Sequence, residues 1–173
     1  MIPTKKLTFA GLFLAFGILL PQIFHLLGGT GPVFLPMHLP VLISGFLLGW
    51  PYSTLIGLIT PVLSSLLTAM PQPPILYFMM VELGAYGLFA GYFFRAKKWR
   101  IFPSLAGAMI LGRIVLAVTV YLLQPLMGLK LSPQAYLTAA LLNGLPGIAL
   151  QLVFVPVLIR LIRRALRWEL QTS

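Results

Sequence analysis

The chain has 173 residues, of which 60% are hydrophobic and only 8% are charged, whereas a water-soluble domain typically carries about 25% charged residues. Twelve Lys and Arg residues face two acids, Glu82 and Glu169, so the net charge is +10. This composition excludes a soluble globular enzyme and a disordered chain. It predicts an integral membrane protein.

Six apolar stretches are long enough to cross a bilayer core, which takes about 20 residues of helix. They cover residues 7–27, 33–49, 52–70, 75–94, 101–127 and 134–162, separated by breaks rich in Gly and Pro. The second and third are separated only by Trp50-Pro51. We expect an all-α integral membrane protein with six transmembrane helices, forming one domain over residues 1–173.

The first stretch follows Lys5 and Lys6, as in a signal peptide. It ends in Gly28-Gly29-Thr30 without a small-x-small cleavage pattern, so we expect it to be retained as the first helix. With six spans, ten basic residues fall on one side of the membrane, and the positive-inside rule then places both termini in the cytoplasm. Lys130 falls on the other side. The ten residues are Lys5, Lys6, Arg95, Lys97, Lys98, Arg100, Arg160, Arg163, Arg164 and Arg167.

This one-sided charge is explained by topology and by contact with anionic membrane lipid, and nucleic-acid binding is not needed to explain it. No Walker phosphate loop is present, so ATP hydrolysis by that chemistry is not expected in this chain. Ser44 and the Ser64-Ser65 pair lack a convincing His/Asp framework for hydrolase chemistry. We therefore expect a protein that is not an enzyme.

Two ionisable residues lie well inside spans, Glu82 in the fourth and Arg113 in the fifth. A charge at the bilayer centre costs about 2.5–3.5 kcal/mol on insertion scales, so it usually faces a cavity or a partner. Asn143 in the sixth span lies at a depth similar to that of Glu82. These three side chains are expected to converge in the outer half of a cavity. An ion pair between Glu82 and Arg113 that fixes helix packing is an equally good and compatible interpretation.

His25 and His38 flank the first outer loop. Imidazole binds several transition metals, but no acid or cysteine accompanies these residues and their spacing fits no common zinc signature. We expect packing roles and no metal or cofactor. Contact of one histidine with a ligand stays open.

Small residues recur four positions apart, which lets another helix approach closely. Gly11 and Ala15 have this spacing in the first span, as do Gly45 and Gly49 in the second and Gly87 and Gly91 in the fourth. For the later pairs, packing within the monomer is at least as good an interpretation.

Several motifs resemble a known family. They are Gly11-Leu12-Phe13-Leu14-Ala15 in the first span, residues 33–42 (VFLPMHLPVL) continuing through 45–49 (GFLLG), residues 60–68 (TPVLSSLLT), and 82–87 (ELGAYG). Together with six short-looped helices and a basic face, they are similar to the substrate-binding S component of an energy-coupling factor (ECF) transporter, an ABC-type importer of vitamins. The resemblance covers most of the chain.

The resemblance implies a protein of a bacterial or archaeal cell membrane that captures a micronutrient outside. It implies two kinds of partner: a transmembrane coupling (T) protein and two ABC ATPases. The coupling motif of the family corresponds to Gly11 and Ala15, with Gly in place of the first Ala. The family's ligand sites imply a set of substrate-binding residues here: Glu82, Tyr86, Arg113, Tyr121, Gln124 and Asn143, with His38 and Gln72 as contacts from the covering loops.

The motifs indicate the family more specifically than they indicate the ligand. A free Arg113 would pair an anionic group bidentately, as in pantothenate or niacin, whereas Glu82 would accept from a pyridoxine-like or pyrimidine ligand. If the two residues pair with each other, neither inference holds. We expect a small vitamin or precursor, with pantothenate ahead. A stand-alone secondary carrier and a non-transporting membrane scaffold remain alternatives.

Overall fold

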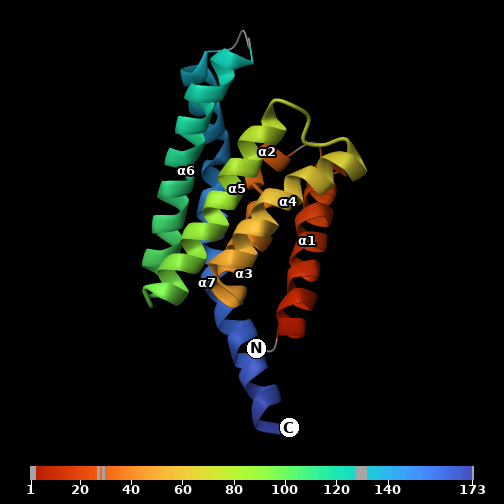
Figure 1. The fold of residues 1–173 in the computed structure, drawn as a ribbon, viewed down its shortest axis with the longest axis vertical. Coiled ribbons are helices and arrows are strands. Elements are labelled where there is room, and N and C mark those ends of the chain that lie inside the picture. Colours follow the sequence, from red (N-terminus) through yellow and green to blue (C-terminus); the bar gives the residue numbers. More distant parts are fainter. Residues whose placement is uncertain (1–2, 27, 29, 128–131, 173) are drawn as a thin grey trace.

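The computed structural model describes residues 3–26, 28, 30–127 and 132–172, without the side chains of Pro3 and of residues 166–172. Within this part of the chain all regular structure is helical (Figure 1). Six segments are long and apolar enough to cross a membrane, which confirms the predicted number. The elements are α1 (Pro3–Leu26), α2 (Gly31–Phe34), α3 (His38–Leu48), α4 (Trp50–Thr68), α5 (Ile75–Gly91), the π-helical turn η1 (Tyr92–Ala96), α6 (Ile101–Leu126) and α7 (Pro133–Thr172).

The second span differs from the continuous helix predicted over residues 33–49. Leu35 adopts a left-handed conformation with φ of 50°, which ends the short α2 before α3 begins at His38. The boundary with the third span is also shifted, because the break lies at Gly49, whose φ is 92°. Glycine takes positive φ at little steric cost. Trp50 and Pro51 instead open α4, where the missing N–H of proline costs nothing.

The start of α1, the α3–α4 turn, η1 and the end of α7 lie at the same end of the molecule (Figure 1). Basic side chains contact the bundle there. Arg95 Nη1 donates to the Leu47 carbonyl oxygen at 2.6 Å, and the Arg163 guanidinium lies 5.3 Å from the centre of the Phe94 ring. We refer to this as the basic end and to the other as the opposite end. Lys130, predicted at the opposite end, lies outside the described residues.

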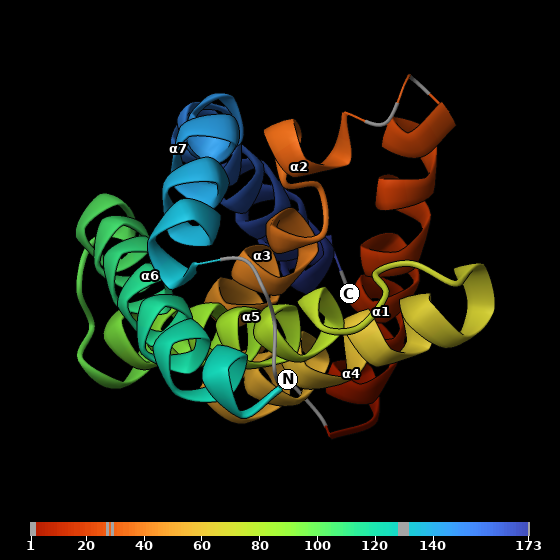
Figure 2. The same cartoon turned by 90° about the horizontal axis from the view of Figure 1, so that it is seen from above.

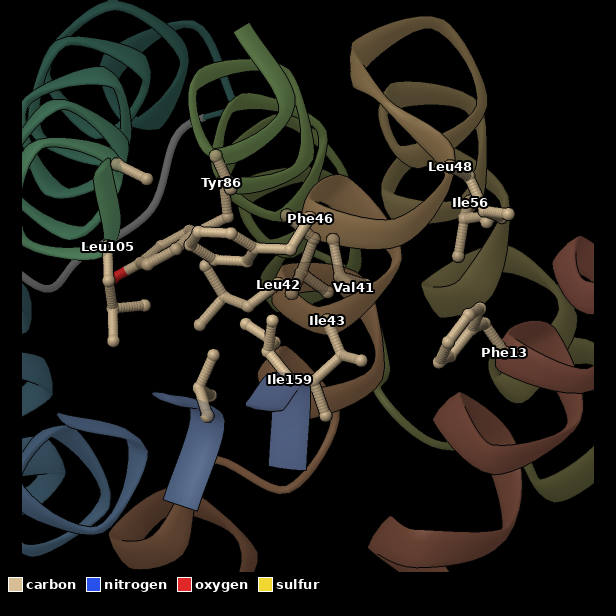
Figure 3. Close-up of a cluster of buried hydrophobic side chains, with 14 of the residues drawn as sticks. Phe13, Val41, Leu42, Ile43, Phe46, Leu48, Ile56, Tyr86, Leu105 and Ile159 are labelled. Atoms are coloured by element: carbon tan, nitrogen blue, oxygen red, sulfur yellow. The ribbon is translucent and has the colours of Figure 1, made fainter. Parts of the chain in front are cut away.

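Helix α3 occupies the middle of the bundle, between α1, α4, α5 and α7 (Figure 2). Its apolar side chains form the main core, in which Val41 and Leu42 are completely buried. Phe46 from α3 and Tyr86 from α5 lie together in the same cluster (Figure 3). The four-residue α2 lies beyond the start of α3, towards the opposite end (Figure 1).

Helices α4 and α5 approach each other through glycine. A Cβ added at Gly87 would overlap the backbone carbonyl of Ser53, and one at Gly57 would overlap that of Leu83. The Ser53 hydroxyl donates to the Gly87 carbonyl at 2.7 Å. The packing interpretation of Gly87 is thus confirmed: its missing side chain lets the two backbones touch within the monomer.

Candidate functional site

A cavity of about 550 Å³ opens near the opposite end of the bundle. This volume lies within the range of about 300–1,000 Å³ found for small-molecule sites. Its wall comes from both ends of the sequence, since α1, α4, α5, α6, α7 and the segment around α2 all contribute. The wall is mainly apolar, with Met37, Ile75, Met79, Leu116 and several prolines and alanines. Its polar side chains are Gln22, His25, His38, Ser64, Gln72, Glu82, Tyr136 and Asn143.

Glu82 is the charged group of this wall and is only 4% exposed. Arg113 Nη1 on α6 lies 3.1 Å from Glu82 Oε1, so the two form an ion pair. His38 Nε2 lies 3.6 Å from the same oxygen, beyond hydrogen-bond distance. The pairing that the sequence left open is therefore present, and it offsets the charge of the only acid that the sequence places inside a span.

The ion pair leaves hydrogen-bonding capacity unused. Glu82 Oε1 has a charged neighbour but no donor with hydrogen-bond geometry, and neither ring nitrogen of His38 has a partner among the described residues. Nε2 of Gln22 is likewise buried without a partner in that part of the chain. A buried polar atom without a hydrogen bond costs about 1–3 kcal/mol, and such atoms call for a specific explanation. Here four such atoms belong to three side chains that line one cavity.

Tyr86 lies behind the cavity. It is completely buried in α5, and its ring meets that of His38 edge to face at 5.0 Å between centroids. Helix α6 fits against it at Gly112, where an added Cβ would come within 2.7 Å of the Tyr86 ring. Tyr86 therefore supports His38 from below and does not itself face the cavity.

The sequence-predicted residues fall into three groups. His38, Gln72, Glu82 and Asn143 line the cavity. Tyr86 and Arg113 lie directly behind it, in contact with His38 and Glu82. Tyr121 and Gln124, near the end of α6, are not part of the wall: Tyr121 is 48% exposed on the outside of the bundle, and Gln124 is 3% exposed within it.

Four polar residues of the wall were not among the predicted site residues: Gln22, Ser64, Tyr136 and His25, whose contact with a ligand the sequence left open. Gln22 and His25 stand three apart on α1 and so share one helix face, and a polar pair on one face of an apolar span was a usable signal. Tyr136 carries no such signal, because it stands at the start of an apolar stretch. Its ring packs on Phe78 of α5 at 5.4 Å.

Gly11 and Ala15 lie on an exposed face of α1. A Cβ at Gly11 would meet no atom within 4 Å, whereas one at Gly17 would press on the Thr60 side chain at 2.5 Å. Large apolar residues surround this face, with Leu12 47% and Leu19 58% exposed. The described part of the chain offers Gly11 no packing partner.

No group of three His, Cys, Asp or Glu side chains that could hold a metal ion occurs among the described residues. The cavity wall itself offers hydrogen-bonding groups and apolar contact, with one charge that Arg113 compensates. Six membrane-spanning segments around such a cavity define a class: a membrane-embedded protein that binds a small molecule.

The comparison with protein families agrees with this class. A family model described as the substrate-specific component of ECF transporters matches residues 5–159, nearly the whole chain. The chain belongs to this family, and it is a substrate-specific, multi-pass membrane subunit of an ECF transporter rather than an enzyme. No match was found among curated proteins or among solved structures.

Proposed function

We propose that this chain captures a small vitamin or vitamin precursor from outside the cell and delivers it to a coupling protein served by two ABC ATPases. The observation that carries the proposal is the cavity at the opposite end, with buried polar atoms on Gln22, His38 and Glu82 that have no hydrogen bond to any described residue. A ligand with complementary donors and acceptors offsets the cost of these atoms. The apolar remainder of the wall holds its hydrocarbon parts.

The ion pair changes the expected ligand. Pantothenate was favoured for a free Arg113, but Arg113 is paired with Glu82 and is not part of the cavity wall. The wall presents mostly neutral polar groups beside one carboxylate. The proposal is therefore a polar ligand without a strong net charge, carrying at least one N–H or O–H donor for Glu82, and pantothenate has no advantage over other small vitamins.

Orientation follows from the basic end. Nine of the ten one-sided basic residues lie in described side chains of α1, the η1 region and α7, at or near that end. The positive-inside rule then places the basic end and both termini in the cytoplasm of a bacterial or archaeal cell. The cavity accordingly faces the outside, where an importer needs its site.

Equilibrium binding tests the ligand proposal. The full chain, purified in mild detergent, is titrated with a panel of vitamins and precursors, and any small molecule retained through purification is identified by mass spectrometry. We expect one compound to bind with submicromolar Kd. If every member of a panel that includes cobalamin, folate, pantothenate and queuosine precursors fails to bind, the vitamin proposal is wrong.

Coupling is tested on the exposed face of α1. Gly11→Leu adds bulk where no atom of the described chain lies within 4 Å, so ligand binding should be unchanged. Capture of the coupling protein, and ATP-dependent uptake, should be lost. Ala149→Leu adds similar bulk on an exposed position of α7 and serves as the control. Uptake that persists without ATPase partners and collapses with the proton gradient would favour a secondary carrier instead.

A further inference from the structure

An open groove of about 530 Å³ lies at the basic end, far from the ligand cavity. It is lined by Phe94 of η1, the first residues of α6 and Arg160 of α7. Two of its residues are arginines, Arg100 and Arg160, and the others are Phe94, Ile101, Phe102 and Pro103. The groove thus combines two positive charges with an apolar wall.

These arginines have no acidic partner in the described part of the chain, where both ion pairs involve Glu82. The whole sequence has two acids against twelve basic residues, and the one acid whose side chain is described, Glu82, is paired with Arg113. A third arginine, Arg163, stands beside it over the Phe94 ring. An anion from outside the chain would complement this charge.

The position of the groove relative to the membrane spans indicates which kind of anion fits it. Arg100 directly precedes the apolar span that begins at Ile101, and Arg160 lies near the end of the last apolar span. Both therefore stand at the level where a bilayer changes from acyl chains to headgroups. Exposed apolar side chains continue from the groove along the lipid-facing surface, with Phe102 52% and Val157 48% exposed. A free phosphate would use the arginines and leave the apolar wall in water.

We propose that this groove binds one anionic phospholipid, with its phosphate between Arg100 and Arg160 and an acyl chain along Phe94 and Phe102. Basic pockets between transmembrane helices are suited to such headgroups, and arginine pairs phosphate oxygens bidentately. The site is independent of the ligand cavity and of the identity of the transported molecule.

Lipid retention tests the proposal. The full chain is reconstituted in nanodiscs of phosphatidylcholine with one-fifth phosphatidylglycerol, extracted in mild detergent, and analysed by native mass spectrometry. We expect one phosphatidylglycerol to remain bound per chain. The variant R100Q/R160Q should lower its apparent affinity by about fivefold per arginine. Both arginines are exposed, and an unchanged melting temperature checks that this variant folds.

The matched control is K97Q/K98Q, which removes the same charge from the same end but from residues that do not line the groove. It should retain the lipid. Equal loss in both variants would overturn the site in favour of a diffuse surface charge. Displacement of the lipid by millimolar inorganic phosphate would assign a phosphate site instead. If R100Q/R160Q keeps its lipid but no longer captures the coupling protein, the groove is a protein interface and the lipid proposal is wrong.

Discussion

The two halves of helix α5 have different roles: one lines the cavity and the other packs closely against neighbouring helices. Its first half lines the cavity with Ile75, Met79 and Glu82, and Glu82 Oε1 has no hydrogen-bond partner among the described residues. In its second half, Gly84, Gly87 and Gly91 lie against α4, so that a Cβ added at any of them would come within 3.0 Å of an α4 atom. The difference separates stability from function along one helix: the close-packed half holds the bundle, and the incompletely satisfied half is available for a ligand.

The largest effect is expected in the close-packed half. Gly87→Leu places a side chain where the Ser53 backbone carbonyl already lies. Overpacking costs about 1–3 kcal/mol and occasionally more, and a backbone obstacle cannot rotate away as a side chain can. We expect no folded monomer, measured by size-exclusion chromatography and thermal unfolding in detergent. Gly11→Leu is the matched control and should melt like the parent chain; a Gly87 variant that did so too would contradict the close contact of α4 and α5.

The next effect concerns the cavity half. Glu82→Gln removes the partner of Arg113, and breaking a buried pair from one side costs about 3–5 kcal/mol, less here because the Arg113 side chain keeps 17% exposure. The loss of a charged hydrogen-bond acceptor should weaken ligand binding by about 10- to 100-fold. The double variant Glu82→Gln with Arg113→Gln should regain thermal stability but not binding. Recovery of both would mean that the pair serves packing alone.

The smallest expected effect is on ligand affinity, and it distinguishes the residues that line the cavity from those that were predicted as site residues but lie outside it. Gln22→Leu removes an amide from the cavity wall and should weaken ligand binding by about fivefold, the value of one neutral hydrogen bond. Tyr121→Leu changes a residue that is 48% exposed outside the bundle, and binding should stay unchanged. Calorimetric titration of both variants is the measurement. The reverse result would restore Tyr121, which the family resemblance implied as a substrate-binding residue, and remove Gln22 from the site.

The sequence was most informative about the depth of each residue in the membrane. Apolar run length predicted the six spans, and residue counting predicted similar depths for Glu82 and Asn143, which line the same cavity. Depth does not give rotation about a helix axis, however. On α6, Val120 is completely buried while the adjacent Tyr121 is half exposed, and no apolar periodicity distinguishes the two in so hydrophobic a helix.

Local backbone geometry was the second feature that the sequence did not predict. The left-handed Leu35 interrupts a stretch that reads as continuous helix, and that break forms the segment from Leu35 to His38, all of which lines the cavity. A leucine gives no sequence signal for positive φ, which is uncommon for residues other than glycine. The choice between an ion pair and two separate ligand contacts likewise depended on a side-chain distance that spacing cannot supply.

The cavity wall joins the first and last spans, from Pro21 on α1 to Asn143 on α7. The wall is therefore incomplete unless both α1 and α7 are in place. Binding then stabilises the assembled bundle. A substrate at about 1,000 times its Kd stabilises the folded bundle by about 4 kcal/mol, so the occupied site holds α1 and α7 together as well as receiving the substrate.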